Sequence, residues 1–125
     1  MNNTEDFVDV WMCEHNKPKP KKENDDIRSF STNTVGLHGK ETKVAIAIEE
    51  MAELTQALVK DIRGQGDYDN IVEEIADVSL MLDQLKVIFG ISDEELSDVM
   101  KYKIRRQMRR DGEVLEEVEN YANWQ

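Results

Sequence analysis

The segment AIAIEEMAELTQALVKDIRG (residues 45–64) decides the fold class, because its apolar residues recur at steps of three and four, as on one face of an α-helix. We expect this helix to begin at about Gly39 or Lys40 and to end at Arg63, where the sequence Gly64-Gln65-Gly66 follows. Its apolar stripe consists of Ala47, Met51, Leu54, Leu58 and Ile62.

A second segment, IVEEIADVSLMLDQL (residues 71–85), has the same period and predicts a second helix that runs until Gly90. Asp67 or Asp69 is expected to cap its N-terminus. Because the connection to the first helix is short, we expect the two to form an antiparallel hairpin. The second stripe consists of Ile71, Ile75, Val78, Leu82, Leu85 and Phe89.

Two further helical segments are predicted after the hairpin. Ser92-x-x-Glu95 has the form of a capping box and predicts a third helix to about Arg110. Gly112 is expected to break this helix. A short fourth segment is then indicated by Val114, Leu115, Val118 and Tyr121.

The N-terminal part of the chain has weaker patterns. Residues 1–15 contain an apolar set that suggests either a short amphipathic helix or a segment docked on the rest, and residues 17–26 (KPKPKKENDD) are interpreted as a linker. Residues 27–38 have no sustained period and predict an irregular segment. We therefore divide the chain into an N-terminal extension or linker, residues 1–30, and one domain, residues 31–125.

The expected fold is all-α: a compact antiparallel helical bundle. A chain of 125 residues is one domain by length, and an aromatic content of 6% is low for a β-sandwich or barrel. Three or four short helices leave apolar faces uncovered, so we expect a homo-oligomer, either a homodimer or a homotetramer.

Charge and cysteine content limit the function classes. The 27 acids and 16 bases give a net charge of −11, which argues against nucleic-acid binding and favours a metal cation as the guest. The only cysteine, Cys13, excludes an internal disulfide, and no signal peptide opens the chain, so we expect a cytoplasmic location. The apolar runs are too short to span a membrane.

Six carboxylates form two matched clusters on the two predicted helices. Each cluster falls within an arc of about 100° and borders the seam between the helices. A solvated charged face is the ordinary explanation, but no Lys or Arg lies between Lys43 and Lys60, or between Asp67 and Lys86, to offset the repulsion. A hairpin would bring the clusters opposite each other as a divalent-cation site. Their members are Glu49, Glu50 and Glu53, and Glu73, Glu74 and Asp77.

The ligand chemistry selects the cation. An all-oxygen cluster suits Mg²⁺ or Mn²⁺, with Ca²⁺ as a further candidate, whereas Zn²⁺ prefers His or Cys among its ligands. Di-iron bundles require Glu-x-x-His steps, which neither His15 nor His38 supplies. Since Mg²⁺ commonly binds through a few carboxylates together with substrate phosphates, a nucleotide or another phosphoester is the indicated substrate.

These residues resemble the signature of a known family. Glu49-Glu50-x-x-Glu53, followed after twenty residues by Glu74-x-x-Asp77, is similar to the EExxE…ExxD motif of the MazG-like all-α nucleoside triphosphate pyrophosphohydrolases. That family is related to the dimeric dUTPases and the dCTP pyrophosphatases. The resemblance covers roughly residues 35–110, and KIRRQMRR (residues 103–110) is similar to the basic stretch that follows the family's central helices.

The resemblance implies an activity and a set of roles. The family cleaves a nucleoside triphosphate between the α- and β-phosphates, releasing the monophosphate and pyrophosphate, and a role in clearing the nucleotide pool is one possibility. Glu49 would help to hold a further metal or orient the attacking water, and Glu73 lies outside the signature. The Mg²⁺ ligands would be Glu50, Glu53, Glu74 and Asp77.

Basic residues supply the candidate substrate contacts. Lys43 stands where many family members have a Gln that faces the nucleotide, which implies either that Lys43 contacts phosphate instead or that the helix is placed differently. Residues 101–110 contain six of the sixteen bases, and Lys103, Arg106 and Arg110 share one helical face. We interpret these three as a clamp on the β- and γ-phosphates. Charge complementation at a helix C-terminus and a nucleic-acid patch are the alternatives.

Two other functions fit the same residues. One is a non-catalytic helical interaction module whose acids bind a basic partner or a structural cation. The other keeps the pyrophosphohydrolase chemistry but acts on a different phosphorylated metabolite.

Overall fold

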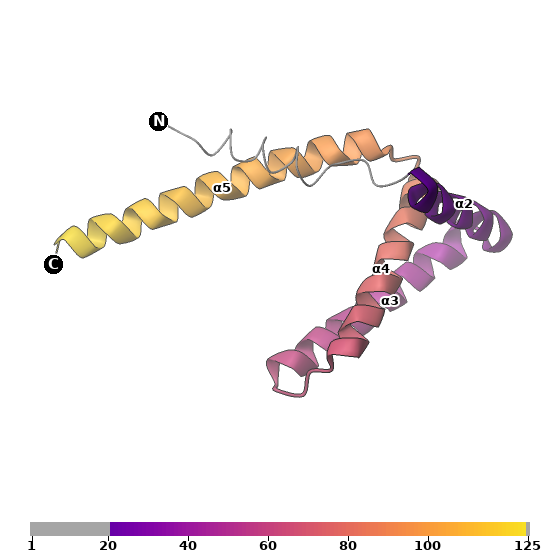
Figure 1. Cartoon of the computed structure of the whole chain (residues 1–125), viewed down its shortest axis with the longest axis horizontal. Coiled ribbons are helices and arrows are strands. Elements are labelled where there is room, and N and C mark those ends of the chain that lie inside the picture. Colours follow the sequence, from indigo (N-terminus) through magenta and orange to yellow (C-terminus); the bar gives the residue numbers. More distant parts are fainter. Residues whose placement is uncertain (1–20, 125) are drawn as a thin grey trace. The chain divides into compact units, whose positions relative to one another are not determined.

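The computed structural model describes residues 21–124, and within this range the protein is all-α. Four helices make up almost the whole of it: α2 (Lys21–His38), α3 (Lys40–Ile62), α4 (Tyr68–Phe89) and α5 (Asp93–Trp124) (Figure 1). The predictions for residues 1–15, and for the first part of the predicted linker, lie outside the described residues. None of the described helices is long and apolar enough to cross a membrane.

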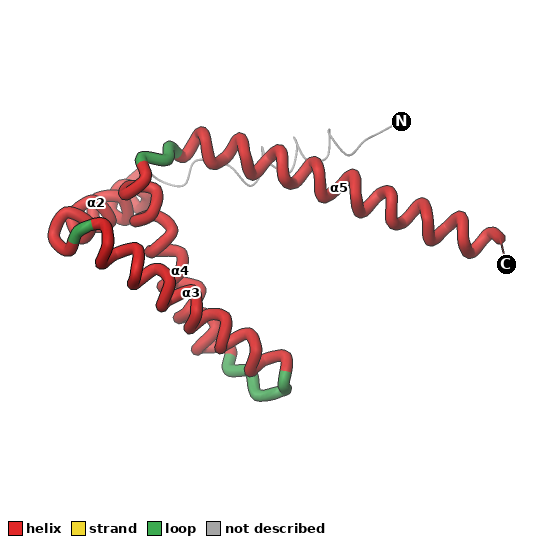
Figure 2. Tube along the Cα trace, turned by 180° about the vertical axis from the view of Figure 1, so that it is seen from behind, coloured by secondary structure: helices red, strands yellow, loops and turns green. Residues whose placement is uncertain are grey.

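The chain divides into two compact units. One contains α2, α3 and α4, and the other contains α5. The loops that separate α2 from α3 and α3 from α4 are short (Figure 2). The first unit carries the acidic clusters, and the second carries the basic stretch.

The hairpin of α3 and α4 is confirmed as predicted, with both ends defined by hydrogen bonds. At the end of α3, Gly64 adopts φ 77° and the Gln65 amide donates to the Lys60 carbonyl oxygen at 2.9 Å, which is the pattern of a Schellman cap. Asp67 is the N-cap of α4, since its carboxylate accepts a hydrogen bond from the Asn70 amide at 3.2 Å.

The seam between α3 and α4 differs from the predicted stripes. The buried apolar residues of these two helices are Ala47, Ala57 and Met81, whereas six of the eleven predicted stripe residues remain exposed. Each of the two helices has more apolar surface than their mutual contact covers. Part of each predicted stripe therefore stays exposed. The exposed stripe residues are Met51, Leu58, Ile62, Ile75, Leu82 and Phe89.

Helix α2 corrects the prediction of an irregular segment at residues 27–38 and of a linker reaching residue 26. The helix contacts α4, and its less exposed residues recur at steps of three and four and include two apolar ones, Ile27 and Val35. Ser31 on this side is fully buried. The predicted boundary between residues 30 and 31 therefore falls inside a helix.

An ion pair anchors α2 to α4. The Arg28 guanidinium donates to both carboxylate oxygens of Asp83, at 2.9–3.3 Å, and the Lys86 ammonium lies 3.3 Å from the same carboxylate. Burial raises the pKa of Asp83, but hydrogen bonding to Arg28, together with the nearby Ser31 hydroxyl and the Lys86 ammonium, outweighs burial and holds the pKa below its usual value. The Ser31 hydroxyl contributes through proximity, because no well-aligned hydrogen bond joins it to the described residues.

Helix α5 is continuous through Gly112, so the predicted break and the separate fourth segment are wrong. The N-terminus is as predicted, with the Ser92 hydroxyl accepting a hydrogen bond from the Glu95 amide at 3.0 Å. Near Gly112 the Gln107 amide donates a hydrogen bond to the Asp111 carboxylate at 2.8 Å along the helix. The cost of a glycine in a helix, about 1 kcal/mol relative to alanine, is not enough to end it.

Candidate metal centre

Glu50, Glu74 and Asp77 form the centre of the acidic site. One carboxylate oxygen from each lies within 4.8 Å of the other two, with Glu50 supplied by α3 and the other two by α4. The hairpin brings them together because residues before the Gly64 turn face residues after it. These three are therefore placed as a single cluster, as the sequence pattern predicted for two facing helices.

Two of these carboxylates have an unusual environment. The Oε2 atoms of Glu50 and Glu74 are buried, and neither has a hydrogen-bond partner among the described residues. A shielded carboxylate oxygen without a hydrogen-bond partner is unfavourable when the group is charged. The lone pairs of these two oxygen atoms are therefore available to bind a cation.

The charges in the cluster oppose one another. Burial raises the pKa of Glu50, and the charges of Glu53, Asp77 and Glu74 raise it further, as does a hydrogen bond with Glu53. Burial also raises the pKa of Glu74, with the charges of Glu53, Asp77 and Glu73 adding to it. Without a cation, the cluster is therefore electrostatically unfavourable in its ionised form.

The remaining predicted acids lie at the edge of this cluster. Glu53 is exposed and is not one of the three that converge, but its charge acts on both Glu50 and Glu74. Glu49 is exposed on α3, and no contact joins it to the cluster within the described part of the chain. Glu73, which lies outside the family signature, is exposed and acts on Glu74 through its charge alone.

The donor set fits a hard divalent cation. Carboxylate oxygens from two facing helices, two of them buried and without partners, are the ligand type that Mg²⁺ and Mn²⁺ prefer. A three-carboxylate set also leaves coordination positions for water and phosphate oxygens. No Cys or His of the described residues joins the cluster.

The predicted basic contacts have different surroundings. Lys43 is 8% exposed, and it precedes Ala47 and Glu50 on the same face of α3, at steps of four and three residues. Lys103, Arg106 and Arg110 lie on α5, in the other compact unit. The Arg106 guanidinium stacks over the Tyr102 ring, 5.9 Å from its centre.

The alternative explanation of the basic stretch as a helix C-terminal feature is wrong. Because α5 continues to Trp124, residues 101–110 lie near the middle of the helix, and its last turn contains no basic residue. The macrodipole acts only within the first and last turns, so it does not account for these charges.

Sequence reasoning missed Asp83 and its partners. In the sequence, Asp83 is one of several acids on α4. Arg28, with which it pairs, lies 55 positions earlier. Its one local signal is Lys86, three residues further along the same helix.

Comparison with known proteins adds no relative: no protein-family model, curated protein or solved structure matches this chain.

Proposed function

We propose that the chain is a Mg²⁺-dependent pyrophosphohydrolase that cleaves a nucleoside triphosphate, NTP or dNTP, between the α- and β-phosphates. One observation carries the proposal: Glu50 and Glu74 bury unpartnered carboxylate oxygens beside Asp77, on two facing helices. The resemblance of the motif to the MazG-like family supplies the reaction. A location in the cytoplasm and a role in controlling the nucleotide pool belong to the same proposal.

The roles of the residues follow from their positions. Glu50, Glu74 and Asp77 would hold the cation, with Glu53 joining them after a change of side-chain rotamer. Mg²⁺ or Mn²⁺ bound there would neutralise phosphate charge and lower the pKa of a water that attacks the α-phosphorus. Glu49 is proposed to orient that water. Lys43, and separately Lys103, Arg106 and Arg110, are proposed to bind phosphate oxygens.

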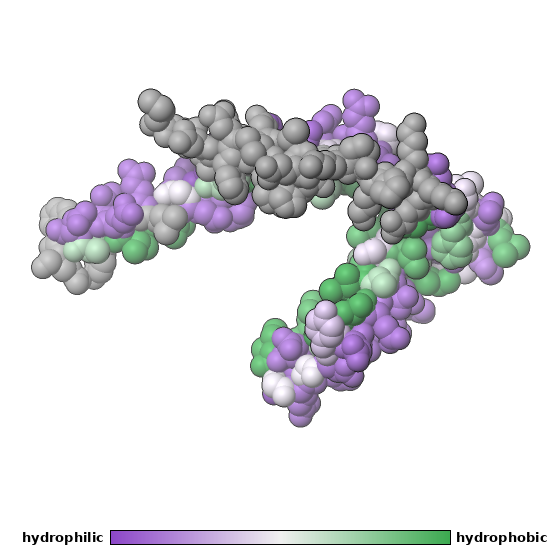
Figure 3. Space-filling model, in the orientation of Figure 1, coloured by the Kyte–Doolittle hydropathy of each residue, from purple (hydrophilic) through white to green (hydrophobic). Residues whose placement is uncertain are grey.

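We also propose that the protein works as a homodimer or homotetramer. The support is the apolar surface that α3 and α4 leave uncovered, where Ile62 is 85% exposed and Phe89 is 55% exposed. Figure 3 shows part of this apolar surface along the hairpin. A bundle completed by a second copy would bury it. Replacing Ile75 by Lys should then lower the assembly state in sedimentation without unfolding the protein, because Ile75 is half exposed within one chain.

The test is pyrophosphate release. The protein is incubated with each common NTP and dNTP in the presence of Mg²⁺, with Glu53→Gln and Asp77→Asn as inactive variants. Glu73→Gln is the matched control, because it removes the same charge from a neighbouring residue outside the signature. No release from any nucleotide, or equal release from the wild type and both variants, would contradict the proposal.

A non-catalytic cation-binding module is the second candidate. It is favoured by the fact that the three carboxylates converge within one hairpin, with no substrate required to assemble them. Thermal melting separates the two, because a ligand that binds the native state raises the midpoint. A rise with Mg²⁺ alone, and no further rise with a non-hydrolysable triphosphate, would favour the module. Release of a product from another phosphorylated metabolite would keep the chemistry and change the substrate.

A further inference from the structure

One side of α5 is partly buried, although α5 is the only described helix of its compact unit. By comparison, Val99 is 46% exposed and Val118 is 60% exposed on other sides of the same helix. The less exposed residues recur at steps of three and four, and at about 100° per residue they fall within an arc of about 100°. Since these exposures are those of a single chain, a second copy is not needed to account for them. The residues of this partly buried side are Ser97, Lys101, Ile104, Arg105 and Met108.

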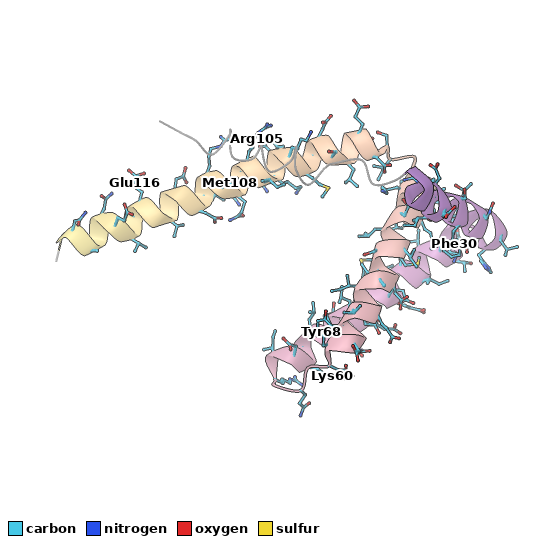
Figure 4. All side chains as sticks on the ribbon, viewed as in Figure 1. Phe30, Lys60, Tyr68, Arg105, Met108 and Glu116 are labelled. Carbon is cyan, nitrogen blue, oxygen red and sulfur yellow. The ribbon has the colours of Figure 1, made fainter. Side chains whose placement is uncertain are left out.

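The partly buried side occupies only the first half of α5. It extends from Ser97 to Met108, which is about 17 Å at about 1.5 Å per residue. Further along the same side of the helix, Gly112 and Glu119 are exposed. Figure 4 shows the side chains of α5, with Arg105 and Met108 labelled in the partly buried part and Glu116 labelled beyond it. A short segment of chain is therefore sufficient to cover this side.

The partly buried side combines apolar and positively charged residues. Ile104 and Met108 lie on it together with Lys101 and Arg105, and residues 101–110 contain no acid that could neutralise these bases. A segment that covers this side should therefore present both apolar residues and acids, because complementary charge favours one partner over others.

Residues 5–15 (EDFVDVWMCEH), which lie outside the described residues, have this composition. They contain four acids and no Lys or Arg. At helical spacing Phe7, Val10, Trp11 and Glu14 share one side, because they follow one another at steps of three, one and three residues. A helix of residues 5–15 would extend about 16 Å, which is close to the length of the partly buried side.

We propose that residues 5–15 dock on the partly buried side of α5 in the same chain. The apolar residues of the segment pack against Ile104 and Met108, and its acids face Lys101 and Arg105. The opposite side of α5, where Lys103 and the other bases of the proposed phosphate clamp are exposed, stays open. The docking does not depend on the metal centre or on pyrophosphohydrolase activity.

The fluorescence of Trp11 tests the docking. The chain contains two tryptophans, so the full chain with Trp124→Phe reports on Trp11 alone. The proposal predicts that Trp11 emits at a shorter wavelength and is quenched less by acrylamide than in urea, because docking shields the indole ring from water. Lys101→Glu places an acid against the acidic segment, so it should move both values towards those in urea.

Lys103→Glu is the matched control for the fluorescence measurement. It makes the same charge change two residues away, on the opposite side of α5, and should leave both values unchanged. Circular dichroism checks that both variants keep their helix content. Emission and quenching equal to those in urea, or equal effects of the two substitutions, would overturn the proposal.

Cross-linking of the native Cys13 tests whether the docked segment belongs to the same chain. Lys101→Cys and Met108→Cys are each treated with a short bismaleimide, with Val99→Cys as the control on the opposite side of α5. Each variant is a mixture of isotopically labelled and unlabelled chains, so that mass spectrometry separates links within a chain from links between chains.

The proposal predicts links within one chain for at least one of Lys101→Cys and Met108→Cys, and none for Val99→Cys. Links that join labelled to unlabelled chains would overturn it, because the segment would then dock on a second copy. Equal linking of all three variants, or no linking at all, would show that the segment does not lie on this side of α5.

Discussion

Glu50 and Glu74 occupy seam positions at which apolar side chains would pack, and this is the feature that gives the site its chemistry. Their Oε2 atoms are buried without hydrogen-bond partners in the described part of the chain, and their pKa values are raised by burial and by neighbouring acids. A cation would reverse both penalties. Under the proposal of a metal centre, these two residues therefore lower the stability of the protein when no cation is bound.

Replacement of Glu74 by Gln should stabilise the metal-free protein at neutral pH. Since the folded-state pKa of Glu74 is raised above 4.5, the stability it contributes is complete below pH 4.5 and is lost as the pH rises through that raised value. The variant lacks this loss, so its melting temperature with a chelator present should fall less between pH 4 and 7 than that of the wild type. A lower melting temperature than the wild type at pH 7 would contradict this explanation.

Asp83 has the opposite electrostatic behaviour and a structural role. Because Arg28 and Lys86 hold its pKa below 3.8, it stabilises the fold above pH 3.8, and this contribution is lost as the pH falls through the lowered pKa. Asp83→Asn should lower the free energy of unfolding by about 2 kcal/mol at pH 7.

The measurement for Asp83 is urea unfolding at pH 7 and at acidic pH. The difference from the wild type should shrink in acid, where both side chains are neutral. Asp98→Asn, an exposed acid on α5, is the control and should change stability by less than about 0.5 kcal/mol. An equally small effect of Asp83→Asn would show that the ion pair does not anchor α2.

At the scale of elements, apolar period and capping residues predicted α3, α4 and the start of α5. Asp67, Gly64 and Ser92 each end or begin a helix as expected. Helix α2 was missed because only two apolar residues, Ile27 and Val35, lie on its less exposed side, with the polar Ser31 and Thr34 between them. Its stability comes from contacts with α4 that no local pattern contains.

The continuity of α5 leads to a test at Gly112. A Cβ added there would meet no atom within 4 Å, and φ is not positive, so Gly112→Ala should increase stability by about 1 kcal/mol. Gly90→Ala is the matched control and should destabilise, since Gly90 has φ 65° at the end of α4. If both substitutions destabilise the protein in chemical unfolding, the continuity of α5 at Gly112 is contradicted.

At the scale of the whole molecule, the convergence of the acids follows from a hairpin that the sequence predicts well. The choice among them does not follow, because Glu49, Glu50 and Glu53 look alike in a sequence, and only the packing of the seam selects Glu50 for burial. The apolar surface is similarly ambiguous, since the same period describes residues that pack within the chain and residues that remain exposed. Which acids converge and which apolar residues are buried both depend on the side of each helix that packs against the neighbouring helix.

The central claim is that the converging carboxylates bind a divalent cation, and calorimetric titration with Mn²⁺ or Mg²⁺ tests it most directly. The proposal predicts saturable binding by the wild type and by Glu73→Gln, with a loss of at least about tenfold in affinity for Glu74→Gln and Asp77→Asn. No saturable binding, or equal binding by all four proteins, would contradict the assignment of Glu50, Glu74 and Asp77 as a metal centre.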